Sequence, residues 1–362
     1  MASPTDRPDM TNFLKAMHHV YKFPTPSTTS TRLEWTPPPA SAGHKGRYLW
    51  TDAFGVLNFV TLFKETSNPY FLSLSEALVS AVHDTLGRTR DGHSRLPNAT
   101  DSDPLAGGLR IGKEEESGPD GDGQYHHYLT LWMFALNRLS LASSRKEYND
   151  LAIQLAKAIH PRFMYNRSSA RPRMYWKMNM DLTHPLVRSE GHLDPIDGLV
   201  MFRLLQHTDG PASRVLEKEI EEYDRIVRLK WENYESRDPL DLGMTMWTAH
   251  FFGIGEEKER WSEHLLNAAK RDTELLFDEG YFEQSTKRRL AFREFGTVLG
   301  IRTGAEGEEW EKRVKVIENW EKTGLVPDPS EEKGAAGRNA EIDLLPITLV
   351  MYAAALNPHA FK

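Results

Sequence analysis

Acidic, histidine and aromatic side chains stand together where a glycine-rich loop gives way to an apolar run, in the stretch GPDGDGQYHHYLTLWMFALNRLS at residues 118–140. Asp122, Tyr125, His126 and His127 come just before the apolar run, where the pattern predicts a helix to start. Carboxylates and imidazoles can give and take protons near neutral pH, as general acid–base catalysis requires. A single group of this kind says little about function, so we ask whether other apolar helices in the chain also start beside acids.

The chain places an acid at the start of six predicted helices that are apolar on most sides. These acids are Asp52, Asp122, Asp194 with Asp197, Asp238 with Asp241, Glu294, and Glu341 with Asp343. The simple explanation is capping, because acids at a helix N-terminus accept free N–H groups and meet the positive end of the dipole. The helices between them also start beside acids but lack a particular set of neighbours. Those neighbours are Trp50, Tyr125, His126, His127, His192, Trp247, His250 and Arg293.

Apolar residues three and four positions apart predict twelve helices and hardly any strand. The six that are apolar on most sides span 51–66, 124–141, 195–206, 240–252, 290–301 and 342–356. The others span 10–22, 72–86, 145–160, 212–231, 256–277 and 308–322, and after the first they carry one apolar stripe and a charged face. Helices apolar all round are buried, whereas striped helices lie at a surface. The alternation predicts an all-α (α/α)6 toroid in which an outer ring, closed by the N-terminal helix, surrounds an inner ring.

This toroid is expected to be a single domain over residues 1–362, with long loops over one face. Residues 21–46 are rich in Pro, Ser and Thr and predict an extended segment. Residues 88–122 predict a long loop or lid, because so long a stretch without periodicity is unusual as a plain connection. An open α-solenoid of helix pairs is the alternative architecture.

In a toroid the N-termini of the inner helices converge, so the polar groups beside them would surround one funnel-shaped pocket. Convergent polar groups between aromatic walls are typical of a small-molecule site. The segment 173–187 predicts a short strand or hairpin, and over the funnel it would add Trp176 and Lys177. The substrate-binding candidates are therefore Trp50, Tyr125, His126, His192, Asp194, Asp241, Trp247, His250, Arg293, Trp176 and Lys177.

The helix alternation, together with YLWTDAFGVLNF and DGQYHHYLTLWMFALNRL, resembles the six-hairpin glycosidase-like superfamily from about Tyr48 onward. That group of (α/α)6 toroids includes many glycoside hydrolases and related sugar epimerases. The resemblance implies a glycosidase-like hydrolase acting on a small sugar-containing substrate. This resemblance concerns the arrangement of the helices, and it does not assign a catalytic role to any individual residue.

Glycosidic bond cleavage needs a carboxylic acid and a carboxylate, roughly 6.5–9.5 Å apart in inverting enzymes. Acids at neighbouring helix starts could supply such a pair, and Asp122 with Asp197 is the first choice. Asp52 is the next candidate. Glu294 is a further one, because the phenylalanines that flank it could raise its pKa and keep it protonated as an acid.

The histidines suggest a second chemistry. His126 and His127 face different directions on a helix, so only one can face the pore, and we name His127 as the catalytic candidate. With His192 or His250 opposite, it could abstract a proton in an isomerase, epimerase, cyclase or lyase acting on a small hydrophobic metabolite. A third hypothesis is a helical-repeat interaction protein without catalysis. The sequence EGHLD at residues 190–194 lacks the helical spacing of zinc enzymes, so we expect neither a metal nor a cofactor.

Composition narrows the function classes further. The formal net charge is −7 with acids and bases interleaved, so the chain lacks the basic face of a nucleic-acid binder. It has no cysteine, which excludes disulfides and thiolate sites. Its apolar runs are too short to span a membrane, and it begins without an apolar leader. The expectation is a cytoplasmic monomer or small homo-oligomer with a small-molecule substrate.

Overall fold

The computed structural model describes residues 8–25, 35–38, 47–113, 115–116, 118, 121–324 and 344–362. The chain divides into two compact units, one of Phe23–Val227 and one of Met1–Lys22 with Arg228–Lys362. The single domain over residues 1–362 stays a prediction. The predicted acids Glu341 and Asp343, and parts of the segments 21–46 and 88–122, lie outside the described residues.

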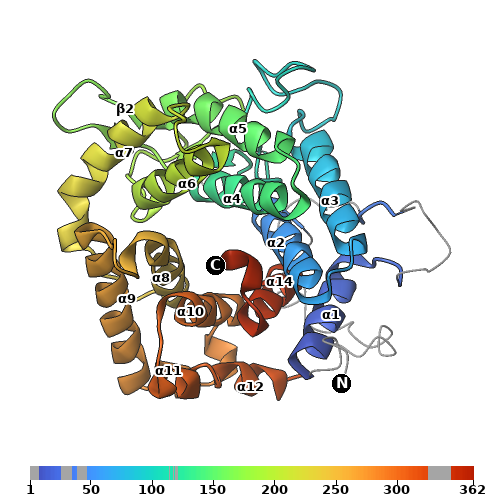
Figure 1. Cartoon of the computed structure of the whole chain (residues 1–362), viewed down its shortest axis with the longest axis vertical. Coiled ribbons are helices and arrows are strands. Elements are labelled where there is room, and N and C mark those ends of the chain that lie inside the picture. The colour runs from blue at the N-terminus through green and yellow to red at the C-terminus, as the bar shows by residue number, and fades with distance from the viewer. Residues whose placement is uncertain are drawn as a thin grey trace. The chain divides into compact units, whose positions relative to one another are not determined.

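The unit Phe23–Val227 is built from helix pairs. Its helices are α2 (Leu49–Thr66), α3 (Tyr70–Leu86), α4 (His126–Ser143), α5 (Glu147–Phe163), α6 (Asp194–Asp209) and α7 (Glu217–Lys230), the last ending just beyond the unit. The buried helices α2, α4 and α6 pack against one another in chain order, with α3 on α2 and α5 on α4 and α6 (Figure 1). Helix α7 lays Tyr223 on Gly198 of α6, where a Cβ would lie 2.4 Å from the tyrosine ring. Glycine therefore lets α7 approach α6 closely.

In the part of the chain that the structure describes, four two-residue strands form two antiparallel pairs. Strand β1 (Gln124–Tyr125) pairs with β4 (Lys177–Met178), and β2 (Met164–Tyr165) pairs with β3 (Arg173–Met174). Both β3 and β4 lie in the predicted strand segment 173–187, but their partners lie before α4 and after α5. The His126 N–H donates to the Trp176 carbonyl at 2.9 Å, which holds this segment against the start of α4.

The described part of the predicted loop 88–122 is packed against the unit, and its residues Leu96, Leu105, Leu109 and Ile111 are buried. The Gln124 side chain bonds the N–H of Leu109 and the carbonyl of Gly107, at 2.9 and 2.8 Å. These contacts favour a fixed wall over an open lid.

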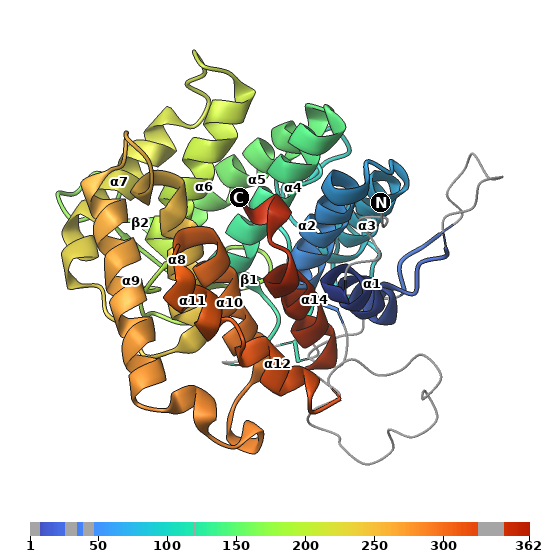
Figure 2. The same ribbon diagram turned by 60° about the horizontal axis from the view of Figure 1, so that its bottom comes forward.

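The second unit repeats the pairing of buried and striped helices. Its described helices are α1 (Pro8–Tyr21), α8 (Pro239–Gly253), α9 (Arg260–Asp278), α10 (Ala291–Gly304), α11 (Glu308–Arg313), α12 (Val316–Glu321) and α14 (Leu345–Leu356). Helix α9 runs along α8, and α10 lies between α8 and α14 (Figures 1 and 2). A Cβ on Gly243 would lie 2.1 Å from the carbonyl of Gly296, so the small residues permit backbone contact between α8 and α10.

The predicted alternation of buried and striped helices is confirmed, and α1 packs against α14 as the expected partner from the N-terminus. The predicted helix 308–322 is instead two short helices, α11 and α12, separated by a turn at Val314 and Lys315. Short 3-10 helices occupy Trp231–Asn233, Tyr281–Glu283, Thr286–Arg288 and His359–Phe361. Among the helices described, none combines the length and apolar character needed to cross a membrane.

Candidate active site at the start of helix α4

His127, in the first turn of α4, lies among four aromatic rings. Its ring centroid is 4.7 Å from that of Tyr128, 5.9 Å from Trp50, 6.1 Å from Trp176 and 6.2 Å from Tyr125. The rings come from α2, β1, α4 and the link between β3 and β4, so distant parts of the sequence meet here. The His127 side chain keeps 31% of its surface exposed. The result is an accessible imidazole with aromatic walls.

Asp194, at the start of α6, stands behind this imidazole. Its Oδ1 lies 3.4 Å from Nδ1 of His127 and 3.4 Å from Nδ1 of His126. The same oxygen accepts the backbone N–H of His127 at 3.1 Å, so Asp194 caps α4 from another helix. Burial would raise the pKa of Asp194, but its contacts with the two histidines outweigh burial and hold that pKa well below the usual range. Asp194 is therefore an anion.

The two adjacent histidines differ in their surroundings, as predicted from their positions on a helix. His126 has no exposed surface and packs against Phe163, with the ring centroids 5.4 Å apart. Its Nε2 lies 2.6 Å from the hydroxyl of Tyr223 on α7. His127 is thus the histidine that can meet a substrate, and His126 lies beneath it.

Trp50 and Tyr128 complete the wall beside His127. The indole of Trp50 is 5% exposed, and its Nε1 has no hydrogen-bond partner among the residues that the structure describes. A buried donor without a partner is unusual and is satisfied when a ligand or water accepts from it. Burial raises the pKa of Tyr128 to about 12, so its hydroxyl stays protonated.

Trp176 and Lys177 reach the cluster through the β1–β4 pair. The Nζ of Lys177 lies 4.5 Å from the centroid of the Tyr125 ring, and Lys177 is 1% exposed. Such a cation–π contact stabilises the buried charge. Trp176 is half-buried, and its Nε1 donates to Ser189 Oγ at 3.1 Å. His192 lies exposed in the loop before α6.

Asp122, the first choice as catalytic acid, lies at the centre of a network that folds the loop 88–122. Its side chain has no exposed surface, and its oxygens accept from five donors. The donors are Nη1 of Arg90 at 3.2 Å and of Arg110 at 3.0 Å, and the N–H groups of Gly112, Lys113 and Gly123 at 2.9, 3.3 and 3.0 Å. This bonding favours a structural role for Asp122, and its catalytic role stays a prediction.

The two other carboxylates named in this unit are also buried. Asp52 lies in the first turn of α2, 3.2 Å from Nε of Arg47, and both side chains are almost fully buried. Asp197 is 7% exposed and follows Asp194 by three residues. Residues three apart lie on the same side of a helix, so Asp197 projects from the same side of α6 as Asp194.

In the other unit, Glu294 sits at the start of α10 with no exposed surface. Its Oε2 accepts from Nη1 of Arg289 at 2.7 Å and from Nε1 of Trp320 at 2.8 Å. Burial outweighs both contacts and raises the pKa of Glu294 to about 7. The expected direction is therefore observed, while the arginine and the tryptophan that surround the carboxyl group come from outside α10.

Asp241 and Arg293, two predicted binding residues, lie at the start of α8 beside Asp238. Asp238 caps this helix by accepting the N–H groups of Leu240 and Asp241, and it also pairs with Arg293. Asp241 accepts from the hydroxyl of Tyr234 at 3.2 Å. Asp238 occupies the N-cap position of α8, whereas the N-cap residues of α2, α4, α6 and α10 are not acids and form no cap hydrogen bond through their side chains.

Trp247 and His250 do not lie beside the acids at the start of α8, which corrects their expected placement. At a rise of 1.5 Å per residue they stand about 9 and 13.5 Å beyond Asp241 along the helix axis. Trp247 is buried and donates from Nε1 to the carbonyl of Phe361 at 3.0 Å. His250 bonds the Trp247 carbonyl through Nδ1 and packs against Phe251. Trp247 and His250 are therefore close to these acids in the sequence but lie farther along the helix.

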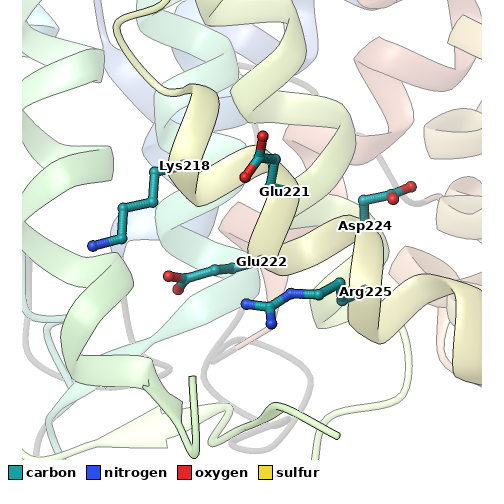
Figure 3. A pocket seen from close by; sticks show the side chains of 5 residues that line it. All are labelled: Lys218, Glu221, Glu222, Asp224 and Arg225. Carbon is teal, nitrogen blue, oxygen red and sulfur yellow. The ribbon is translucent and has the colours of Figure 1, made fainter. Parts of the chain in front are cut away.

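A surface hollow of about 470 Å³ lies on α7. Figure 3 shows its lining residues Lys218, Glu221, Glu222, Asp224 and Arg225, all projecting from that helix. Glu222 is engaged by His160 at 2.9 Å and by Arg167 at 2.6 Å. The hollow has charged walls from a single helix and none of the aromatic residues around His127, so the cluster at α4 is the better candidate.

Tyr128 and Tyr223 are members of the site that sequence reasoning missed. Tyr128 stands three residues after Tyr125, a spacing that could have marked it. Tyr223 lies 97 residues from His126 in an ordinary striped helix, and no local signal identifies it. The part of the chain that the structure describes holds no group of three or more histidines and acids arranged to bind a metal ion.

Three solved structures resemble the chain over nearly its whole length. A family 76 glycoside hydrolase from a bovine Bacteroides thetaiotaomicron strain matches with a TM-score of 0.59 and 13% identity, covering 99% of this chain and 78% of its own. A family 76 mannosidase from Bacteroides thetaiotaomicron has a TM-score of 0.57 and 11% identity, with 100% of both chains covered. A family 76 α-mannanase from this species has a TM-score of 0.57 and 11% identity, with 98% of each chain covered.

No protein-family model matches the sequence, and no curated protein matches it either. The likeness to the three hydrolases shows the fold. It confirms the predicted all-α (α/α)6 toroid fold.

Proposed function

We propose that this protein is a glycosidase-like hydrolase that binds a small sugar-containing substrate against the aromatic residues around His127. The observation that carries the proposal is the accessible His127 imidazole, backed by the Asp194 carboxylate and walled by four aromatic rings. Flat aromatic walls with a few fixed polar groups suit a compact ligand that has both apolar faces and hydroxyl groups. The unpartnered N–H of Trp50 supplies a donor for one such hydroxyl.

His127 is the proton-transfer group in this proposal, and the Asp194 anion stabilises the imidazolium that forms when His127 accepts a proton. In hydrolysis His127 takes a proton from water as the water oxygen bonds to the anomeric carbon. The bond from that carbon to the leaving oxygen breaks, and a carboxylic acid protonates this oxygen. Asp197 is our first choice for that acid, because it projects from the same side of α6 as Asp194. Asp52, Asp122 and Glu294 are the further candidates.

Thermal unfolding against two ligand panels is the first test. One panel holds mono- and oligosaccharides, beginning with α-mannosides because two of the similar structures are a mannosidase and an α-mannanase. The other holds apolar metabolites. A ligand at a hundred times its dissociation constant adds roughly 2.7 kcal/mol of stability, which is readily measured. We expect sugars to raise the midpoint, and a rise with apolar compounds alone would contradict the proposal.

Hydrolysis of 4-nitrophenyl glycosides tests the roles of individual residues. We expect His127→Gln and Asp194→Asn each to lower kcat by roughly 100-fold or more, since general acid–base groups contribute about 10²–10⁴-fold. His207→Gln is the matched control, because His207 is exposed near the other end of α6 and should keep full activity. Equal rates in all three variants would exclude His127 as the proton-transfer group.

One observation favours a second function, proton transfer at carbon by an isomerase, epimerase, cyclase or lyase. The imidazole of His127 is accessible, whereas Asp52 and Asp122 are buried and paired with arginines. A hydrophobic metabolite would also suit the aromatic walls. Mass spectrometry of the products separates the two functions, since hydrolysis adds one water and isomerisation leaves the mass unchanged.

A further inference from the structure

We propose that Tyr223 is a positioning residue which, through His126 and Asp194, makes Nε2 of His127 the nitrogen that accepts the proton. This inference rests on the proposed function in one respect, that His127 is the proton-transfer group. Tyr223 lies on α7 and has no exposed surface, so it acts through its neighbours and does not touch a substrate.

The first step is the short contact of 2.6 Å between the hydroxyl of Tyr223 and Nε2 of His126. Burial raises the pKa of Tyr223 well above its usual value, and nearby acids raise it further, so the hydroxyl keeps its proton and can donate it. The acids facing it are Asp194, Asp197, Glu219 and Glu222. A neutral imidazole has one N–H and one lone pair. If Nε2 of His126 accepts from Tyr223, its Nδ1 must carry the hydrogen.

The second step is the approach of His126 to Asp194. Nδ1 lies 3.4 Å from the Asp194 oxygen, which is long for a hydrogen bond, and Nδ1 makes no well-aligned bond among the described residues. The interaction is therefore mainly electrostatic. A lone pair on Nδ1 would repel the carboxylate, whereas an N–H attracts it. The contacts of both ring nitrogens of His126 thus favour the same tautomer, with hydrogen on Nδ1.

The third step carries this order to His127, whose Nδ1 lies 3.4 Å from the same oxygen. The same repulsion excludes a lone pair on Nδ1 of His127 as long as Asp194 keeps its place, and a lone pair on Nδ1 of His126 would push Asp194 away. The backbone N–H of His127 also donates to this oxygen, so three N–H groups converge on Oδ1 of Asp194. Nε2 of His127 then holds the lone pair, on a side chain that is accessible. A histidine oriented in this way is ready to act as a general base.

The position of Tyr223 is itself strongly constrained. Its ring packs over Gly198, with Phe202 at 5.1 Å and His160 at 4.7 Å between ring centroids. His160 directs its Nε2 to Glu222 at 2.9 Å, so it does not compete for the tyrosine hydroxyl through that nitrogen. The ring is therefore held with its hydroxyl at His126.

Nitrogen-15 NMR of histidine-labelled protein tests the proposal without a substrate. His126→Gln and His127→Gln assign the two imidazoles by loss of signal. We expect both histidines in the wild-type protein to show hydrogen on Nδ1 at a pH where they are neutral. Hydrogen on Nε2 of His127 would overturn the proposal whether or not the protein hydrolyses sugars.

Tyr223→Phe then tests the role of the hydroxyl. We expect His126 to become a mixture of tautomers and the nitrogen shifts of His127 to change. Tyr352→Phe is the matched control, because it removes a tyrosine hydroxyl that bonds Glu321 in the other unit. Unchanged His127 signals in Tyr223→Phe would overturn the proposal. If this variant does not fold, the wild-type tautomer of His126 still tests the proposal, because hydrogen on its Nε2 would mean that Tyr223 does not donate to it.

Kinetics separate positioning from binding. With a 4-nitrophenyl glycoside that the wild type hydrolyses, Tyr223→Phe should lower kcat about 10–100-fold, as for groups that orient metal-bound histidines, and leave KM unchanged. A rise in KM with unchanged kcat would show that Tyr223 affects binding only. If no glycoside is hydrolysed, the proposed function fails while the tautomer measurement still stands.

Discussion

Replacing Glu294 with glutamine should remove a large pH dependence from the stability of the protein. Glu294 is fully buried, and burial raises its pKa from 4.5 to about 7 in spite of donors from Arg289 and Trp320. Between these two pH values the folded protein keeps a proton that the unfolded chain has lost. The stabilisation is therefore complete below about pH 4.5 and disappears as the pH rises through 7.

The expected magnitude follows from the size of this pKa change. Each pH unit between 4.5 and about 7 removes about 1.4 kcal/mol from the free energy of unfolding, so the total loss is about 3 kcal/mol. Glu294→Gln has no proton to lose at this position. Relative to wild type, the variant should gain about 3 kcal/mol between low and high pH, whatever its stability at the starting pH.

Urea unfolding of both proteins at about pH 5 and about pH 8 measures this difference. Glu222→Gln is the control, because the pKa of this buried glutamate shifts in the opposite direction. Burial opposes ionisation of Glu222, but bonds from Arg167 and His160 outweigh it and lower the pKa of Glu222. The carboxylate then contributes stability that is lost only as the pH falls below the unfolded-state pKa, so the stability of Glu222→Gln relative to wild type should change little between about pH 5 and about pH 8. A difference between wild type and Glu294→Gln that stays constant with pH, or that grows in favour of wild type as the pH rises, would refute the reasoning.

Two further predictions concern packing and the loop network. Gly198→Ala places a Cβ 2.4 Å from the Tyr223 ring, so the free energy of unfolding should fall by about 1–3 kcal/mol, and an unchanged thermal midpoint would contradict the close packing of α6 and α7. Asp122→Asn removes the charge that pairs with Arg90 and Arg110, so it should cost about 3–5 kcal/mol and speed proteolysis within residues 88–113. Cleavage at the wild-type rate would show that Asp122 does not hold that segment.

The proposed site depends on one accessible imidazole in a cluster whose other ionisable groups are largely buried. Asp194 is held as an anion by its histidine neighbours, while Lys177 is covered by Tyr125. Such a site has few groups that can exchange protons with a substrate. The kinetic effect of His127→Gln is therefore the most direct measure of whether the cluster is catalytic.

The alternation of buried and striped helices could be predicted from the sequence, because a helix that is apolar on all sides can only be buried. The close packing at Gly198, Gly243 and Gly296 could not be predicted, because the neighbours that require these glycines are remote in sequence. Helix ends were less certain, as the division of 308–322 into α11 and α12 illustrates. The spacing of apolar residues therefore predicts which helices are buried more reliably than it predicts where each helix begins and ends.

By itself the sequence determined the helical class, the pairing of helices and the presence of acids, histidines and aromatic residues at the starts of the buried helices. Only the tertiary structure decided what those groups can do. It paired Asp122 with arginines, surrounded Glu294 with Arg289 and Trp320, and left His127 accessible while His126 met Tyr223 from 97 residues away. The physical reason is that a side chain's protonation and reactivity depend on its burial and its charged neighbours. Those neighbours come from segments that are distant in the chain, so no local pattern encodes them.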